Sequence, residues 1–289
     1  MCYSKEVSLL AGAAISGFSA WSWWFYVKNK GKQISATLQA KIPYFKNAIL
    51  AYLCIAGHQL FEYLAILTGS QFIYKTGLIV SMTFNYFALR SLEKISKFNF
   101  GSKLIPLYLL ANWLEMLRRP MDFTNQHFYV RGYAHLPWGI AWLFLWFYFI
   151  SASLFVAYHS KSPQNKKTGV LSVLLINATF ILSAIYAYLA TIFKFNWLNT
   201  GCLNDLFCSF DLINDFASIW CVIASLQAPF LIILFNLTRD KYDLEAGSKL
   251  QSITWRHRMA LALTSLAILY LFYLFIPIVF GIGWKMISF

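Results

Sequence analysis

Three side chains that could do chemistry together, Cys54, His58 and Glu62, are spaced four residues apart within one apolar stretch. Residues at i, i+4 and i+8 share a helix face, here over about 12 Å at a rise of about 1.5 Å per residue. A histidine and a carboxylate at this spacing can hold a metal ion, pass a proton, or form a neutralised structural pair. The spacing leaves all three alternatives open.

Other polar residues could complete this site or line a path leading to it. Glu115 is one candidate partner, and Asp215 with the adjacent Asn214 is another. The segment 118–137 adds four more candidates, Asp122, His127, Arg131 and His135. Loops with such residues often cap a site, but the arginines and aromatics of this one also suit a belt at the level of lipid headgroups. Both interpretations stay open.

The chain must place these residues in an unusually apolar environment. Of its 289 residues, 59% are hydrophobic, 19% are aromatic and 12% are charged, and the mean hydropathy is +0.57. Soluble domains carry about 25% charged residues. This composition excludes a soluble enzyme, a disordered chain, a disulfide-stapled secreted module and a nucleic-acid-binding domain. We therefore expect one integral membrane domain over 1–289, with the lipid bilayer as its main partner.

The expected fold class is all-α, a polytopic bundle of transmembrane helices. A membrane-spanning helix needs about 20 apolar residues. Eight segments are candidates, and seven of them have this length, so that seven spans is the alternative to eight. The fourth segment in the following list is short: 7–27, 47–68, 72–90, 104–117, 138–158, 170–194, 212–237 and 258–283.

The distribution of basic residues favours eight spans over seven. If 104–117 crosses, four loops on one side hold 17 of the 24 Lys and Arg residues: 28–46, 90–103, 159–169 and 238–258. Loops rich in Lys and Arg stay cytoplasmic. Both termini are then expected outside. The formal charge of +13 is explained by basic residues in cytoplasmic loops, so it does not indicate a nucleic-acid partner.

The acidic residues sort to the opposite side. Four acids, Glu93 among them, are expected in cytoplasmic loops. The other seven fall outside or in outer helix halves: Glu6, Glu62, Glu115, Asp122, Asp205, Asp211 and Asp215. Ionisable groups within a bilayer are costly and usually face a bundle interior or a wet cavity. The sequence therefore predicts a polar, acidic site open to the outer face, taking a small molecule, a lipid or an ion.

The cysteines divide by their expected location. Cys202 and Cys208 share an outer loop, where an oxidising compartment would permit a disulfide. Cys54 lies within a span and is expected to act as a small apolar filler. Cys2 stands at the start of the chain, on the expected outer side.

The N-terminus resembles uncharacterised bacterial membrane proteins that open Met-Cys-Phe-Ser or Met-Cys-Trp-Ser. Residues Met1 to Ser4 read Met-Cys-Tyr-Ser, and 58–62 match a Gln- and Glu-bearing stretch of the family's second helix. The match covers about the first quarter of the chain, and Lys5-Glu6 departs from the usual apolar residues. The resemblance implies that the protein is located in a bacterial plasma membrane and that Cys2 and Glu62 belong to one site. It implies no particular activity.

Two functions follow as expectations. The first is a metal- or thiol-dependent membrane enzyme or a metal-binding protein, with catalytic residues Cys2, His58, Glu62 and Glu115, of which the first three would hold a transition metal. The second is a transporter or channel for a small solute, an ion or a proton, with polar residues such as Asn85 below His58. Enzymatic activity and oligomeric state stay open.

Overall fold

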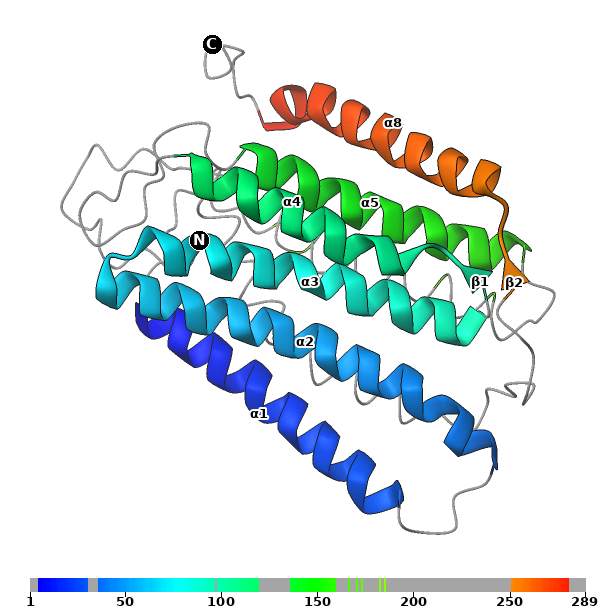
Figure 1. Cartoon of the computed structure of the whole chain (residues 1–289), viewed down its shortest axis with the longest axis horizontal. Coiled ribbons are helices and arrows are strands. Elements are labelled where there is room, and N and C mark those ends of the chain that lie inside the picture. The colour runs from blue at the N-terminus through cyan, green and yellow to red at the C-terminus, as the bar shows by residue number, and fades with distance from the viewer. Residues whose placement is uncertain are drawn as a thin grey trace.

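The computed structural model describes residues 5–30, 36–96, 98–119, 136–159 and 251–280, and five single helical residues between 166 and 185. Its long elements are all helices: α1 (Lys5–Lys30), α2 (Ala36–Thr68), α3 (Gln71–Ser96), α4 (Ile105–Arg118), α5 (Leu136–His159) and α8 (Trp255–Phe280). They lie in a row from α1 through α2, α3 and α5 to α8, with α4 against α3 and α5 (Figure 1). The all-helical fold is confirmed for this part of the chain.

Six of the eight expected helices fall within these residues, and all six are present. The helices α1, α4, α5 and α8 begin and end within three residues of the expected bounds. By contrast, α2 begins at Ala36 instead of 47, and α3 ends at Ser96 instead of 90. The expected bounds were those of the apolar runs. A helix can continue into polar sequence beyond such a run, so α2 and α3 are longer than expected. The segments 170–194 and 212–237 lie outside the described residues except for single positions.

Two of the helices contain a stretch long and apolar enough to cross a membrane. These stretches are Lys46–Thr68 in α2 and Ile140–His159 in α5. About half of each stretch is buried against other parts of the chain. Their length and composition make the fold compatible with membrane association.

A connection of two residues, Gly69 and Ser70, turns α2 back into α3. Gly69 has a φ of 66°, a left-handed conformation that a residue without Cβ adopts readily. Its N–H donates to the carbonyl oxygen of Ala65 over 2.8 Å and so closes the last turn of α2. The short turn makes α2 and α3 antiparallel neighbours along their length (Figure 1).

A short connection at the other end of α3 leads into α4 and also contacts the start of α8. Strand β1 (Phe98–Asn99) and the 3-10 turn η1 (Ser102–Leu104) lie between α3 and α4. Strand β1 pairs in parallel with β2 (Gln251–Ser252), two residues before α8. This pairing holds the start of α8 beside the end of α3 (Figure 1).

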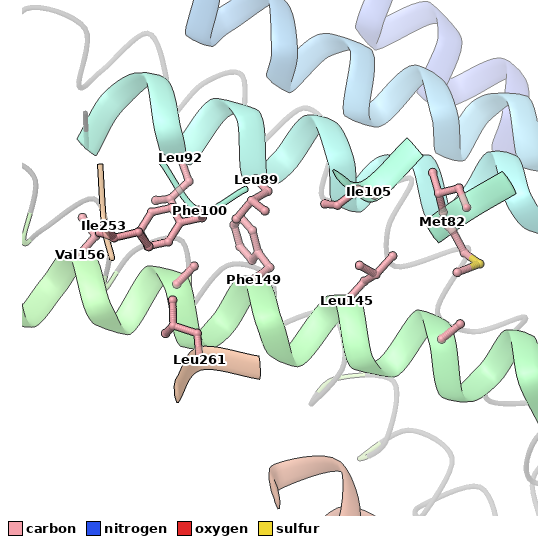
Figure 2. Packing of buried hydrophobic residues seen from close by; sticks show 13 residues of the cluster. Met82, Leu89, Leu92, Phe100, Ile105, Leu145, Phe149, Val156, Ile253 and Leu261 are labelled. Carbon is pink, nitrogen blue, oxygen red and sulfur yellow. The ribbon is translucent and has the colours of Figure 1, made fainter. Parts of the chain in front are cut away.

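The main apolar core lies between α3, α4, α5 and α8. Phe100 lies toward one end of this core, near Leu92 of α3, Val156 of α5 and Ile253, and Met82 lies toward the other end (Figure 2). The region between α1, α2 and α3 is different because several of its buried residues are polar. Those residues are Ser8, His58, Gln59 and Glu62.

Candidate functional site

Glu62 on α2 is buried against α1, with an exposed fraction of 1%. The hydroxyl of Ser8 on α1 donates to Glu62 Oε2 over 3.3 Å, and Ser8 is itself fully buried. Small residues on α1 permit this approach: a Cβ at Gly12 would lie 3.2 Å from Cβ of Gln59. A carboxylate in such a place is costly unless neighbouring groups bind it. Its burial marks Glu62 as a functional candidate.

His58 lies one helical turn before Glu62 and contacts α3. Its Nδ1 is 3.0 Å from the carbonyl oxygen of Gly77. A carbonyl oxygen can only accept, so Nδ1 carries the proton of this bond. In the neutral ring, Nε2 is then left with its lone pair, which is the state that a metal ligand or proton acceptor requires.

Gly77 makes this contact possible because it has no side chain. A Cβ at this position would lie 2.7 Å from Cβ of Phe61 and 3.7 Å from Nδ1 of His58. Real Cβ atoms do not come that close to another carbon, so any larger residue would push α3 away from α2. The glycine therefore fixes the orientation of the imidazole ring.

These residues form two hydrogen-bonded pairs, Ser8–Glu62 between α1 and α2 and His58–Gly77 between α2 and α3. Glu62 and His58 also interact electrostatically. Positions i and i+4 differ by about 40° around a helix, because one turn takes 3.6 residues. That small rotation lets two side chains on nearly the same face of α2 reach different neighbouring helices.

These two pairs supply two side chains that could bind a metal, the imidazole of His58 and the carboxylate of Glu62. Among the described residues, no group of three or more His, Cys, Asp or Glu side chains could hold a metal ion. Cys54, which shares the predicted face, is a half-buried free thiol. The expected third ligand, Cys2, lies outside the described residues, six positions before Ser8 in the sequence.

Glu115 belongs to a separate cluster, at the C-terminal end of α4. It pairs with Arg119 over 2.8 Å and with Arg118 over 3.6 Å. The carbonyl oxygen of Arg119 in turn accepts a 2.6 Å hydrogen bond from Nζ of Lys75 on α3, which is buried. The carboxylate of Glu115 is thus neutralised by its own helix.

The remaining candidates lie outside the described residues and stay predictions. They are Cys2, Asp122, His127, Arg131, His135, Cys202, Cys208, Asn214 and Asp215.

Glu93, expected in a loop, instead lies in α3 with an exposed fraction of 1%. Its Oε1 accepts from the N–H groups of Phe100 and Ser102, over 2.9 and 3.1 Å. Its Oε2 accepts from the hydroxyl of Ser102 over 2.6 Å and from Nη1 of Arg90 over 3.0 Å. This second buried carboxylate was missed, although Arg90 at i−3 was a visible signal for an ion pair on a helix.

Comparison with protein-family models, curated proteins and solved structures finds no match to the chain. The interpretation of both buried carboxylates therefore depends on their own geometry.

Proposed function

We propose that the chain is a multi-pass membrane protein with eight spans and an outward-facing metal site formed by His58, Glu62 and Cys2. Membrane placement is supported by a reversal of the usual side-chain distribution. Large apolar side chains are exposed on the outer helices, while charged ones are buried between helices. Leu10, Leu107 and Leu263 are exposed by 58–70%, whereas Glu62, Lys75 and Glu93 are exposed by 5% or less. Contact with lipid stabilises such an arrangement, and contact with water does not.

The crossing of the short fourth segment is supported by its two attachments to α3. One end is bound at Glu93 through Ser102, and the other at Lys75 through the carbonyl of Arg119. Eighteen residues of helix separate these two points, a distance of about 27 Å. The segment 102–119 thus follows α3 over nearly the thickness of the hydrocarbon core, which is about 30 Å.

The hydrogen bond from His58 Nδ1 to Gly77 carries the metal proposal. Histidines that bind metals almost always donate their other ring N–H to a carbonyl or carboxylate. Glu62, one turn further along α2, offers an oxygen ligand. Cys2 would add a thiolate. It precedes Ser8 by six positions in the sequence, and Ser8 binds Glu62.

A His, Glu and Cys set suits zinc or a related divalent transition metal. Three protein ligands leave a fourth tetrahedral position open for water or substrate, as in catalytic zinc sites. The proposed protein therefore has the ligand set of a membrane-embedded metalloenzyme, as well as that of a metal carrier.

Cobalt substitution tests the proposal most directly. Purified protein is loaded with Co²⁺, and its absorption spectrum and metal content are compared with those of Cys2→Ser, His58→Ala and Cys54→Ser. We expect one metal per chain and a thiolate-to-cobalt band. Both should be lost in Cys2→Ser and His58→Ala but kept in Cys54→Ser, the matched control. Wild-type protein that binds no Co²⁺ or Zn²⁺ would overturn the proposal.

A second candidate function is transport of a proton or a small cation. It is favoured by two buried polar residues that follow Gly77 along α3. Gly77, Ser81 and Asn85 follow one another at four-residue spacing, and Ser81 and Asn85 are buried. They continue from the His58 contact toward the expected cytoplasmic side. Flux into proteoliposomes should then fall in Asn85→Leu while metal content stays unchanged. Equal flux in protein-free vesicles would exclude transport.

A further inference from the structure

Arg258, in the first turn of α8, lies over the connection between α3 and α4. Its Cδ would be 3.9 Å from a Cβ placed on Gly101. It also lies within electrostatic range of the hydroxyl of Tyr148, which donates to the carbonyl of Phe100 over 2.6 Å. Arg258 therefore lies beside Gly101, and the next residue, Ser102, contacts both Arg90 and Glu93 through its hydroxyl.

The guanidinium of Arg258 lacks a complete set of acceptors. Its Nε is buried and has no hydrogen-bond partner within the described structure. The nearby carboxylate of Glu93 already accepts four hydrogen bonds, one of them from Arg90. A carboxylate offers about four lone-pair sites, so Glu93 has none left for a second arginine. The positive charge of Arg258 is thus in excess at this place.

The charges around this connection are also mainly positive. Apart from Glu93, the described charged residues between 90 and 103 are all cations, Arg90, Lys94 and Lys103, and Arg258 adds a fourth. Arg90 keeps a side-chain exposure of 23% despite its ion pair, and Arg258 is partly exposed. Part of each arginine side chain is therefore accessible from outside the bundle.

We propose that Arg258, with Arg90 across the turn at Gly101 and Ser102, binds a phosphate group, and that this group is the headgroup of an anionic phospholipid. Guanidinium groups bind phosphate through two parallel N–H bonds. The ligand would offset the excess positive charge of Arg258 at the exposed part of its side chain.

A lipid is favoured over a free anion by the surroundings of the cluster. Trp255 begins α8 beside the cluster and is 69% exposed, as expected for a side chain at a membrane interface. In the proposed topology this end of the bundle faces the cytoplasmic leaflet, whose surface is anionic. The lipid assignment rests on the proposed membrane placement, but not on the metal site.

The test uses the full chain, purified in a neutral detergent, and follows its Tm with added lipid or phosphate. Phosphatidylglycerol should raise the Tm of the wild type, because a ligand of the folded state stabilises it. Phosphatidylcholine and inorganic phosphate should raise it much less. Most of the phosphatidylglycerol effect should be lost in Arg258→Gln and kept in Arg256→Gln, a matched control on the same helix.

An equal rise in wild type and Arg258→Gln would overturn the proposal, since the lipid would then stabilise the protein without contacting Arg258. A full rise with inorganic phosphate alone would overturn the lipid assignment. If Arg258→Gln does not fold, Arg258→Lys provides the measurement, because it keeps the charge but loses the paired N–H geometry and should bind more weakly. Co²⁺ content of the same samples should not change, which separates this site from the proposed metal site.

Discussion

Lys75 and Glu93 lie five turns apart on the same face of α3, and each binds one end of the segment that follows this helix. Both side chains are buried. The segment 102–119 is therefore held at two fixed points, with apolar contacts from Met82, Leu89, Ile105 and Leu109 between them.

Replacing Glu93 by Gln should destabilise the protein by about 2 kcal/mol. The change removes the charge that pairs with Arg90 and weakens hydrogen bonds from Phe100 and Ser102. Unfolding in detergent, followed by circular dichroism, measures the loss. Glu115→Gln is the control, and it should cost less than about 1 kcal/mol because its ion pairs are exposed. Equal losses in the two variants would contradict the structural role of Glu93.

Gly77→Ala should destabilise the protein by about 1–3 kcal/mol and weaken metal binding. The new methyl group would meet Phe61 at 2.7 Å and displace the carbonyl that orients His58. The control is Gly17→Ala on α1, where a Cβ meets nothing within 4 Å. That change should stabilise the helix by about 0.5–1 kcal/mol. Thermal unfolding and Co²⁺ titration measure both effects, and an unchanged Co²⁺ affinity in Gly77→Ala would argue against His58 as a ligand.

Ser8→Ala should cost about 1 kcal/mol, because Glu62 loses a buried hydrogen-bond donor. Ser22→Ala is a suitable comparison on the same helix. The hydroxyl of Ser22 donates to the carbonyl of Phe18 within α1, so its removal should have little effect. If both serines prove equally dispensable in unfolding experiments, the contact between α1 and Glu62 contributes nothing to stability.

Cysteine labelling tests the crossing of the fourth segment. Lys103→Cys and Arg118→Cys place exposed reporters at its two ends, in a background without the five native cysteines. A membrane-impermeant thiol reagent should label the Arg118→Cys reporter from outside and the Lys103→Cys reporter only after the membrane is opened. Labelling of both reporters from one side would mean that 104–117 does not cross, and the seven-span alternative would then replace eight spans.

The sequence predicts the helices of the described residues because each coincides with an apolar run. It fails at two ends, at Ala36 and Ser96, where polar helix extends beyond the run. Glu93 was misassigned for this reason, because its neighbours Lys94 and Lys97 made it look like part of a solvated loop.

The candidate site was predictable only in part. Spacing alone placed His58 and Glu62 on one side of α2. Their partners Ser8 and Gly77 come from other helices, and no local pattern reveals which helices will pack together. Glu115 shows the opposite case, since the arginines that neutralise it are three and four residues away and could have been recognised as its partners.

The buried charges of Lys75 and Glu93 have a consequence for how the protein is assembled during synthesis. Apart from Arg90, which lies in α3, the groups that bind Glu93 and Lys75 belong to Phe100, Ser102 and Arg119, which follow α3 in the chain. When α3 leaves the ribosome, its buried lysine and glutamate still lack these partners. In the proposed eight-span topology, stable integration of α3 must therefore wait for residues up to 119, and helices α3 and α4 should enter the membrane as one unit.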